Sequence, residues 1–331
     1  MSQTQPTDKN FVLSPSPHIH SGISVKKIMW VVSVALIPSG IAGVVIFGIR
    51  ALYVVLTCIL SAVLTEALVQ KLRGKEITIS DGSAFLTGLL LGYNLPANIP
   101  LWMAALGSTF AIAVAKQAFG GLGHNIFNPA LAGRAFLQIA YPSFMASWPK
   151  PFNVDAVTGA TPLEIVKRGL TDKLPTYLDL FLGNRGGCIG EVAVFALLLG
   201  ALYLLIKGYI KWHIPVSYIA TAAVFTWIFS ARGGPASGGG GFFTGDALFN
   251  ILSGGLILGA FFMATDYVTC PVSRKGKLVF GIGCGLLTAV IRIWSGYPEG
   301  VCYSILMMNA VVPFIDRFTI PRVLGKKGRA G

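Results

Sequence analysis

The amino-acid sequence predicts an all-α membrane protein with several spanning helices. Hydrophobic residues make up 54% of the 331 residues and charged residues 12%, about half the charged share of a typical soluble domain. The mean hydropathy is +0.70, and several apolar runs reach the length of about 20 residues that a helix needs to cross a bilayer. Residues 1–27 lack the pattern of a cleavable signal, so the first apolar run is expected to remain as a helix.

Ten apolar segments are expected to enter the membrane. Two of them, 82–95 and 126–141, are short and are interrupted or bounded by Gly, Pro and Asn, as in Asn94-Leu95-Pro96. Broken helices of this kind are tolerated where protein or water covers the freed backbone groups. The ten segments run over approximately 28–48, 51–69, 82–95, 100–119, 126–141, 189–206, 213–230, 247–264, 278–294 and 299–315.

Lys and Arg residues divide unevenly between the two sides of the membrane. If the N-terminus is cytoplasmic, 17 of the 26 basic residues fall in inside segments and 8 in outside segments, while Arg134 lies within a helix. Because inside loops are enriched in Lys and Arg, both termini are expected in the cytoplasm. The expected order is a cytoplasmic tail, a first membrane repeat, an extracytoplasmic loop, a second membrane repeat and a basic cytoplasmic tail, over 1–27, 28–141, 142–187, 188–316 and 317–331.

Several other classes of function are excluded by missing patterns. The net charge of +13 follows from the topology, and no basic stripe interleaved with exposed aromatic residues indicates nucleic-acid binding. The five scattered cysteines form no C-x-x-C and accompany no His cluster, which argues against an iron–sulfur or zinc site wholly within this chain. The Gly-rich run Ser237–Gly241 lacks the strand, the Lys and the helix of a phosphate loop.

Three sequence blocks recur in the same order in the two halves of the chain. Five helices per half is an odd number, so the halves are expected to be inverted about an axis in the membrane plane. Inverted repeats with broken helices place functional sites at their interface near the midplane. Chance similarity among Gly-, Leu- and Ala-rich helices is the alternative, and the shared order favours a repeat. The paired blocks are 88–92 with 255–259, 105–116 with 281–292, and 128–130 with 309–310.

The longest polar loop contains the heptapeptide Asp155-Ala156-Val157-Thr158-Gly159-Ala160-Thr161. It fits the pattern D-x-x-S/T-G-A-T and resembles the acceptor sequence on which a flavin transferase attaches FMN to the final Thr through a phosphoester. The small residues Gly159 and Ala160 let the backbone approach the transferase closely. The alternative is an ordinary turn before a helix, with Thr161 as N-cap and Glu164 completing a capping box. Both interpretations can hold together.

Acidic residues in or beside the membrane segments are candidates for function, because a charge at a helix centre costs about 2.5–3.5 kcal/mol even on insertion scales. Glu66, near Lys71, is interpreted as a boundary residue, with an ion ligand as the alternative. Asp266 is expected to pair with a basic residue near Arg274. The role of Glu191 is open, and Asp316 with Arg317 is expected at the interface.

Four further stretches accompany the heptapeptide, and together they cover nearly the whole chain. With them the chain resembles the NqrB/RnfD family, which includes RnfD of the Rnf ion-translocating ferredoxin:NAD oxidoreductase complex and, more distantly, NqrB of the sodium-pumping NADH:quinone reductase. The length and the short N-terminal tail favour the Rnf branch. The two five-helix halves of the family look like the urea-transporter fold. The stretches are GHNIFNPALAGRAFL (123–137), TYLDLFLGNRGGCIGE (176–191), GAFFMATDYVTCPVSRKGKLVFGIGCG (259–285) and YPEGVCYSILMMNAVVPFIDR (297–317).

The resemblance implies FMN on Thr161, with Asp155, Thr158, Gly159 and Ala160 completing the attachment motif. It also implies riboflavin or another noncovalent flavin, at residues that the sequence does not assign. The implied protein is a multi-pass subunit in a bacterial or archaeal cell membrane that relays electrons between ferredoxin and NAD, coupled to translocation of sodium or protons. The implied partners are membrane lipid, the other Rnf complex proteins RnfA, RnfB, RnfC, RnfE and RnfG, and a flavin transferase. The chain has no nicotinamide fingerprint, so it holds no complete active site.

Two alternatives to this function are open. One is NqrB, the corresponding protein of a sodium-translocating NADH:quinone reductase, and the other, in a different class, is a channel for a small solute on the same fold. A solute channel has no reason to contain the flavin attachment pattern in an outside loop. The choice between sodium and proton stays open, because no ligand cage is legible in the sequence.

Overall fold

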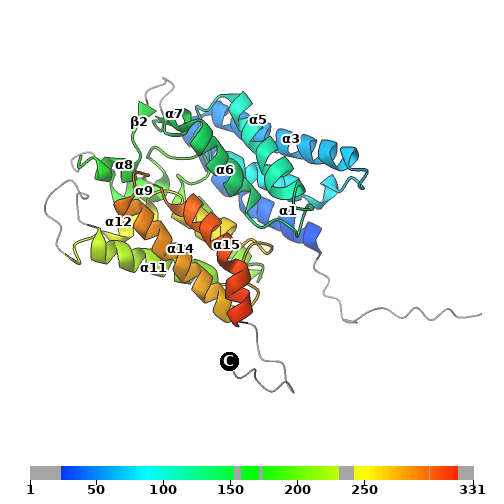
Figure 1. The fold of residues 1–331 in the computed structure, drawn as a ribbon. Helices are drawn as coiled ribbons and strands as arrows, with labels where there is room; N and C mark the ends of the chain where they lie inside the picture. Colours follow the sequence, from blue (N-terminus) through cyan, green and yellow to red (C-terminus); the bar gives the residue numbers. More distant parts are fainter. Residues whose placement is uncertain (1–23, 153–157, 171–173, 231–241, 298, 320–331) are drawn as a thin grey trace, which may run out of the picture.

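The computed structural model describes residues 24–152, 158–170, 174–230, 242–297 and 299–319, and these residues are mostly helical (Figure 1). The helices of the first half are α1 (Val25–Ala35), α2 (Ile37–Phe47), α3 (Ile49–Leu72), α4 (Ser83–Tyr93), α5 (Leu101–Phe110) and α6 (Pro129–Ala140). Those of the second half are α10 (Val194–Ile206), α11 (His213–Phe229), α12 (Ala247–Leu252), α13 (Leu256–Leu258), α14 (Arg274–Trp294) and α15 (Val301–Thr319).

Short elements fill the connection between the halves. They are α7 (Pro142–Met145), β1 (Trp148–Pro149), β2 (Thr158–Gly159), α8 (Pro162–Lys167) and α9 (Tyr177–Leu182). A 3-10 turn spans Ile79–Asp81, and π-helical turns continue α5 over Ala111–Gln117 and α13 over Gly259–Met263. Asp155, the Gly-rich run 237–241 and most of both expected tails lie outside the described residues.

The helical class predicted from the sequence is confirmed, and each of the ten expected segments contains a helix. Four stretches of the described chain are long and apolar enough to cross a membrane: Val25–Phe47, Ile49–Leu72, Arg274–Trp294 and Val301–Thr319. Three further apolar helices, α4, α10 and α11, are shorter. A polytopic membrane protein fits these lengths, while the number of ten spans stays a prediction.

Local sequence explains where the broken helices begin and end. Helix α4 ends at Asn94, whose side-chain amide donates to the Leu90 carbonyl at 2.7 Å. Helix α6 begins after Asn128, whose side-chain oxygen accepts from the amides of Ala130 and Leu131, with Pro129 as the first helical residue. Asn is a preferred N-cap, and Pro at the first position loses no helical hydrogen bond.

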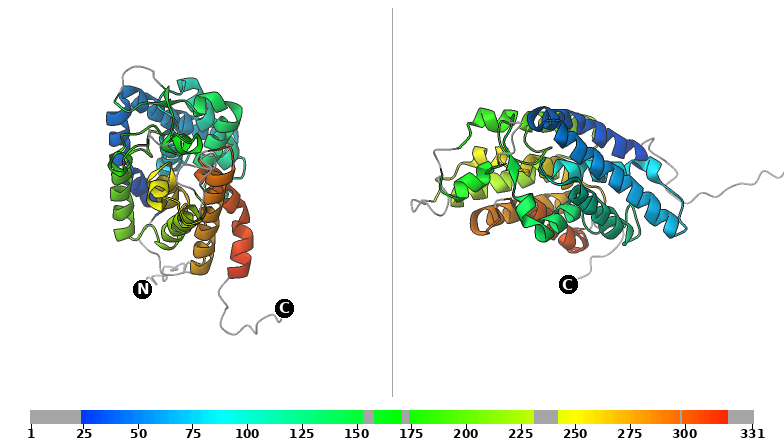
Figure 2. Two further views of the ribbon diagram at one scale, coloured as in Figure 1. Left: turned by 90° about the vertical axis from the view of Figure 1, so that its left-hand side faces the viewer. Right: turned by 90° about the horizontal axis from the view of Figure 1, so that it is seen from above.

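The two halves lie against each other in two layers, with the blue-to-green helices of the first half above the lime-to-red helices of the second (Figures 1 and 2). The same pairings occur in each layer: α3 packs on α4 and α5, as α11 packs on α12 and α14. Likewise α5 packs on α6, as α14 packs on α15. Such matching is what a repeated unit would give, and the inversion stays a prediction.

Broken helices from both halves meet at the interface. The side-chain amide of Asn128 donates to the Met263 carbonyl at 3.3 Å. With its amide oriented to satisfy its neighbours, Asn309 accepts from the Asn128 backbone amide at 3.2 Å and from the Thr269 hydroxyl at 3.0 Å. The two Asn residues that the repeat alignment paired therefore contact each other.

Two acidic residues have partners other than those expected. Glu66 is buried and accepts from Lys116 at 2.8 Å through both carboxylate oxygens, so it is no boundary residue near Lys71. Gln117 adds a hydrogen bond to Glu66 at 2.9 Å, and Lys116 also donates to Ser83 at 2.6 Å. Asp266 caps the following turn through the Thr269 hydroxyl and the Val268 amide, not through a pair with Arg274.

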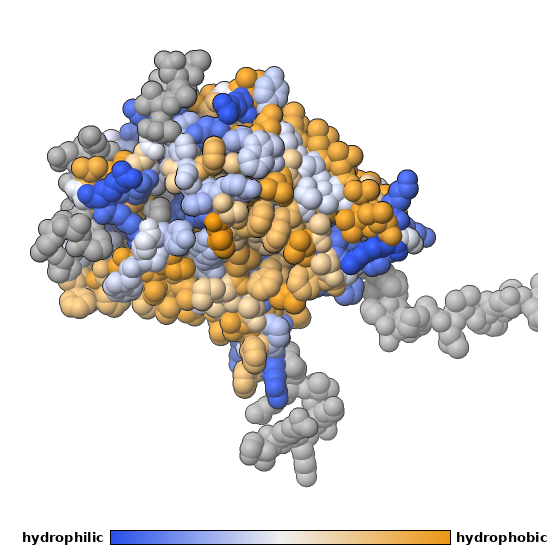
Figure 3. Space-filling model, turned by 45° about the horizontal axis from the view of Figure 1, so that its top comes forward, coloured by the Kyte–Doolittle hydropathy of each residue, from blue (hydrophilic) through white to orange (hydrophobic). Residues whose placement is uncertain are grey.

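The outer surface is largely apolar. Hydrophobic residues cover the middle of the face in Figure 3, and strongly hydrophilic residues gather toward its left and right ends. Exposed side chains such as Leu60, Leu64 and Leu68 of α3 form part of this apolar surface. A surface of this kind suits contact with lipid or with other membrane proteins.

Candidate functional site

The described residues of the loop that contains the heptapeptide form short elements at one end of the helices (Figure 1). Strands β1 and β2 pair antiparallel, with Trp148 opposite Gly159 and Pro149 opposite Thr158. Helix α8 begins after Thr161. Leu163 of α8 packs against Leu180 of α9 and Phe249 of α12 in a hydrophobic cluster. This cluster anchors these elements to the second half of the protein.

Thr161 is the N-cap of α8. Its hydroxyl oxygen accepts from the Glu164 amide at 3.2 Å, and the residue is only 2% exposed. The open approach to this side chain that the sequence suggested is therefore not what the structure has, because the hydroxyl faces inward to satisfy the first turn of the helix. The predicted N-cap is confirmed. The expected capping box is wrong, because the Glu164 carboxylate pairs with Arg168 instead.

A capping box occurs one helix later, at α9. The Thr176 hydroxyl caps the Asp179 amide at 3.2 Å, and the Asp179 carboxylate accepts from the Thr176 amide in return. Hydrogen bonds from the Thr176 hydroxyl and the Asn184 amide lower the pKa of Asp179, because they favour the ionised carboxylate. The start of α9 is thus stabilised by polar side chains of the loop itself.

A cavity of about 370 Å³ lies beside α8. Glu164, Lys167 and Arg168 contribute to it from α8, and Trp148 of β1 and Tyr297 contribute aromatic rings. Lys167 is fixed by hydrogen bonds to the carbonyls of Ser295 at 2.5 Å and Tyr297 at 2.6 Å. Burial and the nearby Arg292 guanidinium lower the pKa of Lys167. Aromatic rings next to cationic side chains suit a flat, anionic ligand.

The inner wall of this cavity is formed by charged side chains that are buried in the protein. Arg134 of α6 and Glu299, just before α15, both line the cavity and form an ion pair with each other. Arg134 also donates to the Asn94 side-chain oxygen at 2.8 Å. This ion pair joins the two halves of the protein, since its partners are 165 residues apart in sequence.

Two more arginines and a second glutamate complete the cluster. Arg185 donates to the backbone carbonyl of Glu191 at 3.0 Å. Arg292 of α14 donates to the carbonyls of Asn250 at 2.5 Å and Ser253 at 3.1 Å, where α12 ends. These residues are all at least nine-tenths buried. We call Arg134, Arg185, Glu191, Arg292 and Glu299 the charge cluster.

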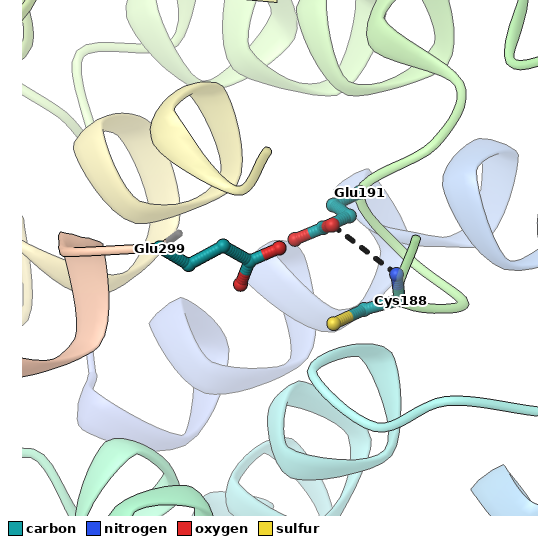
Figure 4. Close-up of side chains that lie close together, drawn as sticks. All are labelled: Cys188, Glu191 and Glu299. Atoms are coloured by element: carbon teal, nitrogen blue, oxygen red, sulfur yellow. Dashed lines mark hydrogen bonds between the residues drawn. The ribbon is translucent and has the colours of Figure 1, made fainter. Parts of the chain in front are cut away.

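Glu191 and Glu299 point their carboxylates toward one another, with the Cys188 thiol beside them (Figure 4). One oxygen from each carboxylate and the sulfur lie within 4.8 Å of one another. The Cys188 amide donates to Glu191 Oε1 at 3.2 Å, and Arg134 donates to Glu299 Oε2. The remaining oxygens, Glu191 Oε2 and Glu299 Oε1, are buried and have no hydrogen-bond partner among the described residues.

The sequence did not reveal this cluster. The count of basic residues on the two sides of the membrane included Arg185 and Arg292 among the 8 outside residues and Lys116 among the 17 inside residues. The structure buries all three. Without them the inside segments hold 16 basic residues and the outside segments 6, so the asymmetry persists. The available signal was Arg134 within an apolar helix, because a charge there needs a buried partner.

A second cavity lies at the interface between the halves. It is lined from the first half by Lys116, Asn125 and Asn128, and from the second by Thr265 and Asp266. Its volume of about 80 Å³ makes it smaller than the cavity beside α8. The broken-helix ends that the sequence placed near the midplane therefore border a cavity with polar groups.

Comparison with known proteins gives consistent matches over almost the full chain. The profile of the NQR2, RnfD, RnfE family matches residues 12–325. The D subunit of a proton-translocating ferredoxin:NAD(+) oxidoreductase complex from Clostridium ljungdahlii is 51% identical, over 99% of this chain and 100% of that protein. The D subunit of a Na(+)-translocating ferredoxin:NAD(+) oxidoreductase complex from Acetobacterium woodii is 48% identical, over 96% of both chains. The D subunit of an ion-translocating oxidoreductase complex from Methanosarcina acetivorans is 37% identical, over 96% of this chain and 98% of that protein.

Proposed function

The chain belongs to the NQR2, RnfD, RnfE family, and we propose that it is a membrane subunit of an ion-translocating ferredoxin:NAD oxidoreductase complex. Relatives with this function in their names match it at 51% and 48% identity over nearly full length. The family resemblance inferred from the sequence is thereby confirmed. The other proteins of such a complex are the proposed partners, and the cell membrane is the proposed location.

We propose further that Thr161 bears FMN through a phosphoester. The observation that supports this most is the cavity beside α8, the helix that begins directly after Thr161, because this cavity offers rings from Trp148 and Tyr297 and cations from Lys167 and Arg168. Flavin supplies one-electron chemistry when bound, and the protein supplies position and electrostatics. Because Thr161 is buried as an N-cap, attachment requires the first turn of α8 to open.

The residues around this cavity have separable roles in the proposal. Trp148 and Tyr297 would hold a flat ring by stacking. Lys167 and Arg134 would favour negative charge on that ring, since both bring a buried or half-buried cation to the cavity wall. The packing of Leu163 against α9 and α12 would keep α8, and with it the attachment point, in place.

The interface cavity is the proposed site for a second, noncovalent flavin, and its volume of about 80 Å³ would have to widen to admit the flavin ring. Asn125 and Asn128 offer amide groups, and Asp266 and Lys116 offer charged groups of opposite sign at its wall. Such groups can bind the polar edge of a flavin ring, while apolar residues such as Leu90 and Phe262 line its face. Partner proteins of the complex would supply the further centres that electrons need to reach NAD.

Covalent flavin is tested most directly on the denatured chain. On a denaturing gel viewed under ultraviolet light, the band of this protein is expected to fluoresce, and mass spectrometry of the peptide that contains Thr161 is expected to show an FMN adduct. A dark band would favour the alternative of a solute channel. The electron acceptor of the purified complex distinguishes the proposed function from the NADH:quinone reductase alternative. A complex that reduces quinone with NADH would support that alternative.

The isolated chain is expected to be inactive in NADH oxidation and in ferredoxin reduction. The reason is that its sequence contains neither a nicotinamide fingerprint nor iron–sulfur cysteine motifs. The measurement compares NADH oxidation by the purified chain with that of the whole complex. Appreciable activity of the chain alone would contradict its assignment as one dependent part of a larger complex.

The flavin-motif loop is expected on the outer side of the membrane, as the distribution of basic residues predicts. Lys150→Cys beside β1 is expected to react with a membrane-impermeant thiol reagent in intact cells. Lys75→Cys, in the exposed turn after α3, is the matched control and is expected to react only after lysis. The native cysteines are all buried, so their background is low. The reverse labelling pattern would invert the topology.

A further inference from the structure

Two carboxylate oxygens of the charge cluster are buried without a hydrogen-bond partner among the described residues. They are Glu191 Oε2 and Glu299 Oε1, and the two carboxylates point toward one another (Figure 4). The other oxygen of each carboxylate is held in place, by the Cys188 amide or by Arg134. Two ionised oxygens close together in a buried site repel, and a proton or metal cation bound between them would remove this repulsion.

Two glycines lie beside these oxygens. Gly255 follows the break between α12 and α13, and a Cβ added to it would lie 2.8 Å from Glu191 Oε2. A Cβ on the neighbouring Gly254 would lie 2.9 Å from Leu163, 3.1 Å from Arg292 and 3.8 Å from the Glu299 side chain. Only glycine therefore fits at these two positions without crowding the charge cluster, and any side chain at Gly255 would press on Glu191.

We propose that Glu191 and Glu299 bind one exchangeable monovalent cation, a sodium ion or a proton, between their free oxygens. This inference rests on the proposed function and gives the translocated ion a binding site in this chain. The site lies at the junction of the two halves, since Glu191 precedes α10, Glu299 precedes α15, and the partner of Glu299 is Arg134 of α6.

The charge balance selects a monovalent cation that exchanges. With both carboxylates ionised, the three arginines and two glutamates of the charge cluster carry a net charge of +1. A monovalent cation raises this to +2 and a divalent cation to +3, which is costly in a site of low dielectric constant. Arg185 and Arg292 bond to backbone carbonyls, so only Arg134 neutralises a carboxylate directly. The other titratable groups that act on the pair are Cys188 and Cys302.

The same balance links cation binding to electron transfer. Arg134 and Glu299 form the inner wall of the cavity beside α8, in which we propose the flavin lies. If the partner proteins delivered one electron from ferredoxin to that cavity, it would add one negative charge next to the charge cluster. Uptake of one cation by Glu191 and Glu299 would cancel this charge, and loss of the electron to the next carrier would favour release of the cation. Electrons and positive charges would then move in equal numbers.

The test is chemical modification of the carboxyl groups in the purified whole complex. Dicyclohexylcarbodiimide reacts with a protonated carboxyl group in an apolar site, and the cavity gives it a route to Glu299. A bound sodium ion excludes the proton and blocks the reaction. The adduct is located by mass spectrometry, at fixed pH with varied sodium and at fixed sodium with varied pH.

Each outcome decides the proposal. Protection of Glu299 or Glu191 by sodium at constant pH supports a sodium site. Modification that rises as the pH falls and ignores sodium supports a proton site. No modification of either residue, or modification that ignores both sodium and pH, overturns the proposal. The experiment does not need the flavin, so in a Thr161→Ala complex the same binding result is expected even if the covalent attachment is elsewhere.

Variants separate this site from unspecific effects. Glu191→Gln is expected to abolish sodium protection of Glu299, and Gly255→Ala, which keeps both carboxylates, is expected to require about tenfold more sodium because its methyl group crowds Glu191. Glu76→Gln, at an exposed position in the turn after α3, is the matched control and is expected to behave as the wild type. Cys188→Ala is expected to retain protection; its loss would indicate a thiolate-held metal and overturn the assignment.

The link to electron transfer has its own readout. If one sodium ion is taken up per electron, the one-electron midpoint potential of the covalent flavin is expected to rise by about 59 mV for each tenfold increase in sodium. If the site binds a proton instead, the midpoint potential is expected to rise by about 59 mV for each unit by which the pH falls. This dependence is expected to disappear in Glu191→Gln. A wild-type potential with the same sodium and pH dependence as that variant would overturn the coupling.

Discussion

Thr161→Ala is expected to remove the covalent flavin from this protein completely. The substitution deletes the hydroxyl oxygen through which the proposed phosphoester forms, and no other atom of the side chain can replace it. Ferredoxin-driven NAD reduction by the whole complex is expected to fall to background, because a relay without its redox centre passes no electrons. The measurements are ultraviolet fluorescence of this protein on a denaturing gel and mass spectrometry of the peptide that contains residue 161.

The role of Thr161 as an N-cap calls for a control variant. Thr161 caps α8, so the Ala variant also loses about 1 kcal/mol of helix stability. Thr161→Asn keeps a good N-cap and still lacks the hydroxyl, and it is expected to lose the flavin as fully as the Ala variant. Thr158→Ala is expected to retain it. Flavin that persists in both Thr161 variants and disappears in Thr158→Ala would move the attachment to Thr158.

Glu66→Ala is expected to destabilise the protein by about 3–5 kcal/mol, because it leaves the buried ammonium of Lys116 without a countercharge. Lys116 and Glu66 are each about 1% exposed, so water does not replace the lost partner. The measurement is the thermal unfolding midpoint of the purified protein in detergent, together with the yield from the membrane.

A double variant distinguishes this ion pair from simple loss of packing. Glu66→Gln combined with Lys116→Met removes both charges while it nearly preserves side-chain volume, and it is expected to recover most of the lost stability. The side-chain amides of Gln117 and Gln70 can still donate to the new amide oxygen. A double variant as unstable as Glu66→Ala would show that the charges themselves matter little, and would contradict the prediction.

The sequence determined the features that depend on neighbouring residues. Apolar runs specified a helical membrane protein, because hydrophobic length and period act locally. Asn94-Leu95-Pro96 marked where α4 ends, since Asn caps helices and Pro lacks an amide hydrogen, while the segment expected from residue 126 begins as α6 only after Asn128. The N-cap at Thr161 and the family membership were likewise legible from the residues.

Only the tertiary structure decided which charges are buried and with whom they pair. Glu66 meets Lys116 across 50 residues, and Arg134 meets Glu299 across 165. Nothing in a local pattern specifies such partners, because an ion pair depends on distance in space and on removal from water. Burial of Thr161 has the same origin. Its surroundings come from the packing of α8 against α9 and α12, which the heptapeptide itself does not encode.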